Sequence, residues 1–267
     1  MSMRSVHKAL DILESIGSSR QGNGGLTVSD ISRALDMPTS TVGRFLTALV
    51  EKGLVFRDPR TRKYGLSWKM AELGTSAVVA PRRFQVMIRL LTDLVGSVQE
   101  TASMVWKYGY GGVYGLEIPC ARTLRAIHEP GSSAPLHCTA FGKVLLGAYD
   151  PNELGTYIEE TGLPEYTRFT ITNAYALREQ LQEIRRQGFA IEKHEWEIGA
   201  GSVAALVSGG EGIPFGAIGV TGAVARLEDY GYENLGRQIV LAATELSAIY
   251  GFHPSVSDEL DQAQETQ

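Results

Sequence analysis

The 267-residue sequence predicts an α+β protein in two parts, an N-terminal winged helix-turn-helix and a C-terminal antiparallel sheet covered by helices. Three observations lead to this prediction. Residues 26–66 combine two helices with apolar stripes, a short turn and a basic hairpin. Beyond residue 82, short strand-like runs lie in groups between helical segments. The charge also changes sign, because residues 1–80 hold 11 Lys and Arg against 7 Asp and Glu, whereas the remainder holds 14 against 23.

The first three predicted helices follow from caps and apolar spacing. A helix is expected from Ser5 to about Ser18, and its apolar residues on one face are Val6, Ala9, Leu10, Leu13 and Ile16. The second helix starts at Thr27, because Thr27 and Asp30 have the spacing of a capping box. It ends before Pro38, since the residue preceding a proline avoids the helical region. The third helix carries a full apolar stripe made of Val42, Phe45, Leu46, Leu49 and Val50.

A basic hairpin follows the third helix. Gly53 is placed to end that helix in the left-handed conformation. Val55 and Phe56 form one expected strand and residues 64–66 the other, with the turn-forming pair Asp58-Pro59 between them. The tip of this hairpin carries Arg57, Arg60, Arg62 and Lys63. The pattern predicts a wing.

The exposed face of the third helix and the wing carry the residues expected to contact DNA. Hydroxyls in the first turn of a helix, with an arginine one turn later, suit phosphate and base-edge contacts in a major groove. The predicted DNA-binding residues are Thr39, Ser40, Thr41, Arg44, Arg60, Arg62 and Lys63. The alternative is a three-helix interaction module with a solvated charged loop. Both helices, the turn and the basic hairpin occur together, which favours DNA binding.

Four segments are expected along the chain: residues 1–66 as the DNA-binding domain, 67–82 as a linker helix stopped by Pro81, 83–252 as the second domain, and 253–267 as an acidic, disordered tail. The predicted helices of the second domain are 84–98, 139–149, 152–161, 175–187 and 232–250. Its predicted strands are 101–108, 112–118, 123–128, 189–195, 202–208 and 215–221.

Composition excludes several classes of protein. No apolar run is long enough to span a membrane, and the N-terminus has no secretory apolar region. Two cysteines, Cys120 and Cys138, cannot form a disulfide framework and fit a reducing cytoplasm. We therefore expect a cytoplasmic protein that binds no membrane.

The second domain shows no spacing typical of catalysis, metal binding or a cofactor. His137 and Cys138 are neighbours, whose side chains point apart, so they make a poor base and nucleophile. Acidic and histidine residues gather at 192–197, but in no metal-ligand spacing. Gly142-Lys143 lacks the rest of a phosphate-binding loop. Thr139 opens a short helix whose first N–H groups could hold a carboxylate; the alternative is a helix simply capped by Thr139.

Three blocks carry a resemblance to a known family. They are residues 26–66, PLHCTAFGKVLLGA at 135–148 and GFAIEKHEWEIGAGSVAALV at 188–207. Together they resemble the IclR family of bacterial transcription regulators. The resemblance implies a winged helix, a linker helix and a C-terminal GAF-like domain that binds a small effector. It also implies homodimers, often paired into homotetramers, that act as repressors or activators at a double-stranded DNA operator.

The resemblance also implies an effector site between the segment 138–143 and the strands around 188–207. The N–H groups of Ala140 and Phe141 match an anion-holding turn, and Glu192 matches an acidic position that contacts the ligand. Ser202 stands where cysteine is frequent and Leu206 where proline is common, so the chemistry of the pocket is expected to differ. The effector is expected to be a small organic acid. Its predicted contacts are Leu124, Thr139, Ala140, Phe141, Gly142, Glu192 and Ser202.

Two hypotheses follow from the sequence. The first is a DNA-binding regulator whose operator affinity is modulated by a small molecule. The second is an enzyme-like small-molecule domain fused to a winged helix whose DNA binding is incidental. They differ in one observable property, which is whether the small molecule changes DNA affinity without being consumed.

Overall fold

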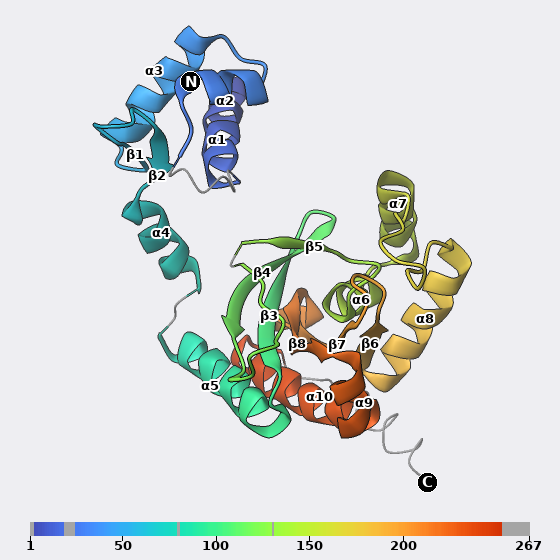
Figure 1. Ribbon diagram of the computed structural model, residues 1–267. Helices are drawn as coiled ribbons and strands as arrows, with labels where there is room; N and C mark the ends of the chain where they lie inside the picture. Colours follow the sequence, from blue (N-terminus) through green and yellow to red (C-terminus); the bar gives the residue numbers. More distant parts are fainter. Residues whose placement is uncertain (1–2, 19–24, 79–80, 130, 253–267) are drawn as a thin grey trace. The chain divides into compact units, whose positions relative to one another are not determined.

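The protein divides into two compact units, Met1–Ala80 and Pro81–Gln267, in a computed structural model that describes residues 3–18, 25–78, 81–129 and 131–252 (Figure 1). The predicted tail, 253–267, lies outside the described residues. The N-terminal unit contains α1 (Met3–Gly17), α2 (Val28–Ala34), α3 (Thr39–Glu51), β1 (Val55–Arg57), β2 (Tyr64–Leu66) and α4 (Trp68–Val78).

The winged helix-turn-helix is confirmed. Thr27 and Asp30 form the predicted capping box at the start of α2, and β1 pairs with β2 in antiparallel register. Gly53 follows α3 with a φ of 71°, the left-handed conformation expected after a helix. The small core of this unit comprises Ile12, Ile16, Ile31, Met37, Val42, Leu46, Leu49 and Val55.

The apolar face of α1 differs from the prediction. Ile16 is buried as expected, but Val6 and Leu10 are 48% and 49% exposed. Ile12, which the predicted stripe left out, is fully buried instead. The helix therefore turns only part of its apolar surface toward the unit's own core and leaves the other part open to contact with another surface.

The C-terminal unit is built on a six-stranded antiparallel sheet in the order β5-β4-β3-β8-β7-β6 (Figure 1). Its strands are β3 (Thr101–Tyr108), β4 (Gly111–Ile118), β5 (Ser133–Pro135), β6 (Phe189–Lys193), β7 (Ala200–Ser208) and β8 (Pro214–Ala223). Its helices are α5 (Pro81–Val98), α6 (Ala140–Gly147), α7 (Pro151–Thr161), α8 (Ala174–Gln187), α9 (Val224–Tyr230) and α10 (Tyr232–Ile249), with a short 3₁₀ turn at Gly210–Gly212.

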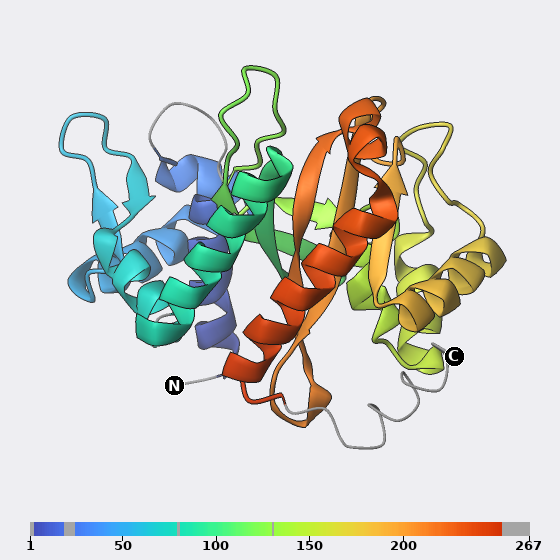
Figure 2. The same cartoon turned by 90° about the horizontal axis from the view of Figure 1, so that it is seen from below.

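Two apolar cores lie on the two faces of this sheet. α5 and α10 pack on one face, and Figure 2 shows α10 lying across the strands. α6, α7 and α8 contribute to the core on the other face. α6 lies close to the segment before it, because a Cβ added at Gly142 would come within 2.2 Å of the Leu136 Cα. Glycine is needed there for this close approach, which fixes the start of α6 against the sheet.

One predicted strand was wrong. Residues 123–128 are not a strand, because the strand β5 pairs with Gly111–Val113 at the edge of the sheet. A side-chain hydrogen bond holds this segment against the sheet instead, because the Thr101 hydroxyl donates to the Ala126 carbonyl at 2.8 Å. The helix α4 ends at Val78, before Pro81, and Pro81 is the first residue of α5, where its missing N–H costs no hydrogen bond. The helix α9 was not predicted.

None of the helices within the described ranges is long and apolar enough to cross a membrane.

Candidate functional site

A row of polar side chains crosses the sheet on the face covered by α6. Glu192 on β6 lies opposite Ser202 on β7, and Ser202 lies opposite Thr221 on β8. Thr221 in turn lies opposite Thr101 on β3. Directly opposed residues of antiparallel strands point to the same face, so these side chains form one continuous row among apolar neighbours.

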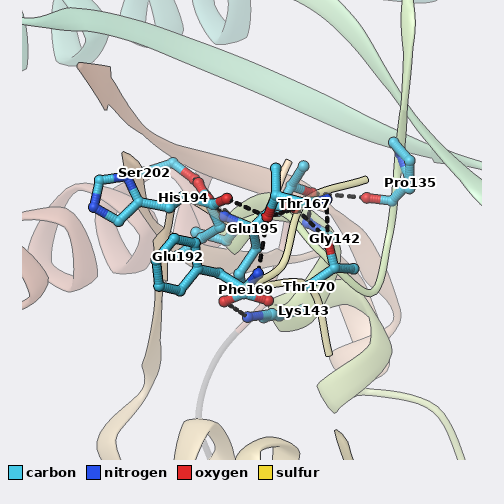
Figure 3. Close-up of polar contacts among 12 residues, drawn as sticks. Pro135, Gly142, Lys143, Thr167, Phe169, Thr170, Glu192, His194, Glu195 and Ser202 are labelled. Carbon is cyan, nitrogen blue, oxygen red and sulfur yellow. Dashed lines mark hydrogen bonds and ion pairs between the residues drawn. The ribbon is translucent and has the colours of Figure 1, made fainter. Parts of the chain in front are cut away.

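Glu192 is the buried carboxyl group of this row. One oxygen accepts from the Ser202 hydroxyl at 3.0 Å, and the other accepts from the Glu195 backbone N–H at 2.7 Å (Figure 3). The residue is 4% exposed, and burial raises the pKa of its carboxyl to about 7. Glu192 therefore changes its charge near neutral pH, where an ordinary glutamate is fully ionised.

Ser202 joins Glu192 to the start of α6. Its hydroxyl oxygen accepts from the Ala140 N–H at 3.2 Å. Thr139 caps the same helix by accepting from the Gly142 N–H at 3.1 Å, and it donates to the Pro135 carbonyl at 2.9 Å. Of the two N–H groups expected to hold an anion, that of Ala140 is thus already bonded within the protein, and Thr139 caps the helix at Gly142.

A buried ion pair lies beside this network. The Lys143 ammonium is fully buried and contacts one oxygen of Glu195 (Figure 3). The second oxygen of Glu195 has no partner within the described residues. Burial raises the pKa of the Glu195 carboxyl, and Lys143 acts in the opposite direction. The pair ties the turn after β6 to α6.

A cavity of about 720 Å³ opens over the polar row, a volume typical of small-molecule sites. Glu192, Ser202, Thr221 and Thr139 line it, together with residues 124–128 and 196–200. The Thr221 hydroxyl is the most informative group of this lining. It is 7% exposed and makes no hydrogen bond with the described part of the chain. A buried hydroxyl costs free energy unless it has a partner, so Thr221 offers a contact to a bound molecule.

His128 forms one wall of the cavity and is rigidly held. Its Nδ1 lies 2.7 Å from one oxygen of Glu117, and its backbone N–H donates to the other at 2.9 Å. Its ring stacks on Tyr114 with 3.8 Å between centroids. Because the carboxylate accepts from Nδ1–H, the remaining nitrogen Nε2 is left for a ligand.

The other wall carries positive charge. Arg226 of α9 binds the buried carboxylate of Glu100, with 2.9 Å between Nη2 and Oε2. Arg122 lies 3.5 Å from the same carboxylate, so two guanidinium groups share one negative charge. Arg226 and Arg125 both line the cavity. This side of the cavity therefore attracts an anion.

The structure brings four of the predicted effector contacts into the cavity and leaves three outside its lining. Glu192, Ser202, Thr139 and Leu124 line it, although Leu124 is 77% exposed and lies at the open side. Outside the lining are Ala140, Phe141 and Gly142. The Phe141 ring belongs to the apolar core instead.

Sequence reasoning missed Thr221, His128 and the arginines. The period-2 pattern of β8 could have found Thr221 once its register with β7 was known. No local signal marks Arg226, because it belongs to the helix α9 that was not predicted.

The predicted DNA-binding residues lie on α3 and at the tip of the wing. Exposed among them are Thr39, Ser40, Arg44, Arg60 and Arg62, whereas Thr41 and Lys63 are half-buried. Asp58 organises the wing by accepting from the N–H groups of Arg60 at 2.7 Å and Thr61 at 2.9 Å. Backbone hydrogen bonds from Thr61 and Arg60 lower the pKa of Asp58. The basic side chains thus project from a defined turn.

The adjacent His137 and Cys138 do not form a catalytic pair. Both ring nitrogens of His137 are engaged, Nε2 by the Pro164 carbonyl at 3.0 Å and Nδ1 by the Tyr157 hydroxyl at 3.2 Å. Burial raises the pKa of the Cys138 thiol to about 12, so it carries no thiolate at neutral pH. Within the described ranges no group of three or more His, Cys, Asp or Glu residues is arranged to hold a metal ion.

A helix-turn-helix with a basic wing, joined in one chain to a domain with a polar cavity, defines a DNA-binding regulator. The helix-turn-helix domain of the IclR family matches residues 5–59, and the C-terminal domain of bacterial IclR transcriptional regulators matches residues 78–248. The chain is 30% identical over 255 residues to the HTH-type transcriptional regulator BhcR of Paracoccus denitrificans, covering 94% of this chain and 88% of that protein.

Solved structures show the same fold. A putative IclR transcriptional regulator from Silicibacter sp. TM1040 superposes with a TM-score of 0.83 at 22% identity, over 94% of this chain and 98% of that one. An IclR homologue from Microbacterium hydrocarbonoxydans, solved in complex with 4-hydroxybenzoate, gives a TM-score of 0.78 at 20% identity, over 91% and 98% of the two chains. The chain belongs to the IclR family of bacterial transcriptional regulators. Like its named relatives, the protein is a transcriptional regulator rather than an enzyme.

Proposed function

We propose that this regulator binds a small organic acid in the cavity of the C-terminal unit, and that the acid modulates its affinity for a DNA operator. The observation that carries the proposal is the buried Thr221 hydroxyl, which has no hydrogen-bond partner among the described residues and faces a cavity of about 720 Å³. The structural neighbour that binds 4-hydroxybenzoate supports an acid as the ligand. Residues 83–252 then serve as the effector domain and 67–82 as the linker to the DNA-binding residues 1–66.

We expect the effector's carboxylate to lie toward the guanidinium groups of Arg226 and Arg125, which line the cavity. The sequence predicts the carboxylate at the start of α6, but the Ala140 N–H already donates to the Ser202 hydroxyl oxygen. The positive charge shared by Arg226 and Arg122 is an alternative anion partner. The opposite end of the effector meets Thr221 and Glu192. The Thr221 hydroxyl can donate to a carbonyl or hydroxyl oxygen of the effector, and the Glu192 carboxyl can accept from an effector hydroxyl.

A thermal-shift screen of small organic acids tests the site. Hits are expected to stabilise the wild type and to bind Thr221→Val more weakly by about 1 kcal/mol, the usual contribution of one hydrogen bond. Thr244→Val is a matched control, because Thr244 lies on the exposed side of α10, away from the cavity lining. An acid that stabilises both variants like the wild type would place the effector elsewhere.

For DNA we propose that Thr39, Ser40, Thr41 and Arg44 enter the major groove, and that Arg60, Arg62 and Lys63 of the wing contact phosphates. One winged helix reads only a few base pairs, so a specific operator requires two copies related by symmetry. The half-exposed Val6 and Leu10 of α1, with Trp68 and Leu73 of α4, fit a homodimer surface. The C-terminal units could pair dimers into tetramers.

Light scattering of the full chain at micromolar concentration tests the assembly. A dimer or tetramer is expected, and Leu10→Asp should shift it toward the monomer and weaken binding to a two-half-site operator. A monomeric wild type that binds a single half-site tightly would contradict the proposal.

A further inference from the structure

The C-terminal unit contains a second cavity, of about 490 Å³, that goes beyond the proposed function. It lies between the start of β4, the strand β5, the helix α7 and the loop after α7. Trp196 is the one residue that lines both cavities within the described ranges. The second cavity is therefore a separate space that shares Trp196 with the first, and Glu192, Ser202 and Thr221 of the polar row do not line it.

Aromatic rings dominate the lining of this second cavity. Tyr110 and Tyr157 meet edge to face with 6.0 Å between centroids, and the His137 ring lies 6.1 Å from that of Tyr166. Trp196 adds an indole. Aromatic rings prefer offset-stacked or edge-to-face contact with another ring, so the walls favour a planar aromatic molecule over an aliphatic one.

The floor of the cavity is neutral and fixed. The Pro164 carbonyl can only accept, so His137 Nε2 carries the proton and Nδ1 accepts from the Tyr157 hydroxyl. That hydroxyl also accepts from the His137 N–H at 3.2 Å. Burial lowers the pKa of His137, in agreement with a neutral ring. His137 and Tyr157 are each 1% exposed, so this wall exists before any ligand binds.

The absence of charged side chains in the lining favours an uncharged ligand. None of its residues is an acid, a lysine or an arginine. A carboxylate or an ammonium group would lose its water there without gaining an ionic partner, which is costly. The rim tyrosines Tyr110 and Tyr166 are 45% and 47% exposed. They can bond one polar group of an uncharged ring.

We propose that this cavity is a second ligand site, which takes uncharged aromatic compounds of the phenol class. Its ligand differs from the anion proposed for the first cavity. The sites meet at Trp196, whose ring lies parallel to Tyr114 and His128 in the first cavity.

Calorimetric titration of the full chain with phenol tests the proposal. The double variant Tyr110→Ala/Tyr166→Ala removes both rim rings and leaves the buried floor in place. It should bind phenol about tenfold more weakly or worse, since two aromatic contacts and their hydroxyls are lost. Tyr175→Ala is the matched control, because Tyr175 is 69% exposed on α8 and lines neither cavity. A saturating concentration of benzoate should not displace phenol, because benzoate has the same ring with a charge.

Equal phenol affinity in the double variant and the wild type would overturn the proposal. Loss of phenol binding in Thr221→Val, or its displacement by benzoate, would place phenol in the first cavity and overturn it as well. The absence of any phenol binding would also refute it. These results leave the acid-binding proposal untouched, because that proposal is tested by the acid screen.

Discussion

The buried carboxyl group of Glu192 makes folding stability depend on pH, and Glu192→Gln should remove this dependence. The pKa of this carboxyl is about 7 in the folded protein, against 4.5 for a free glutamate, because burial disfavours its charged form. Between pH 4.5 and 7 the unfolded chain loses the proton while the folded protein keeps it. Stability therefore falls as the pH rises through this window, and the full cost is present above pH 7.

The magnitude follows from the two pKa values. At 1.36 kcal/mol for each pKa unit, their difference corresponds to roughly 3 kcal/mol above pH 7. At pH 5 most of this cost is absent, and about 1 kcal/mol remains. Glutamine keeps the shape but cannot ionise, and it loses one of the acceptor positions used by Ser202 and the Glu195 N–H. That loss does not depend on pH, so it cancels when two pH values are compared.

Urea unfolding followed by tryptophan fluorescence measures the effect, because Trp106 and Trp196 both belong to the C-terminal unit. The free energy of unfolding of Glu192→Gln, relative to that of the wild type, should be about 2 kcal/mol higher at pH 8 than at pH 5, so the variant gains relative stability as the pH rises. Glu197→Gln is the control, since Glu197 is exposed on the same turn and should show no such difference. A relative stability of Glu192→Gln that is equal at both pH values, or that falls with pH, would refute the burial argument.

Three further predictions concern other parts of the molecule. Arg44→Ala should reduce the free energy of operator binding by about 1–3 kcal/mol and relax sequence specificity. Arg62→Ala should weaken binding to all duplexes alike and reduce the slope of log affinity against log salt concentration by about 1. Both effects are measured by DNA binding across salt concentrations. Lys143→Met should destabilise the C-terminal unit by about 3–5 kcal/mol in urea, because it leaves Glu195 unpaired, and the double variant Lys143→Met/Glu195→Gln should recover much of this loss. Thr221→Val should raise the melting temperature slightly, since it removes an unpartnered hydroxyl, while it weakens acid binding.

The winged helix could be predicted from the sequence because its signals are local. A capping box, a proline, a glycine after a helix and a basic hairpin each act within a few residues, and Thr27, Pro38 and Gly53 occupy the expected positions. The prediction of a strand at residues 123–128 was wrong because an alternating pattern does not reveal whether a free edge of the sheet exists for that strand to pair with. The strand β5 occupies that edge through pairs such as Gly111 with Pro135, which are far apart in the sequence.

The cavity was only partly predictable. Glu192 and Ser202 came from the family resemblance, and the structure places them opposite each other on β6 and β7. Thr221 becomes part of the same row only through the pairing of β7 with β8, which no short pattern specifies. The N–H of Ala140 was expected to hold the ligand, but a side chain 62 residues away uses it. Such long-range hydrogen bonds appear only once the strands are assembled.

The measurement that tests the central claim most directly is operator affinity with and without a bound acid. A duplex selected from a random pool by the full-length protein supplies the operator, and the acid screen supplies the ligand. A saturating acid should change the dissociation constant of the selected duplex by about fivefold or more, with the acid recovered intact. Thr221→Val should bind the duplex like the wild type but require more acid for the same change. An unchanged operator affinity at saturating acid, or consumption of the acid, would contradict the account.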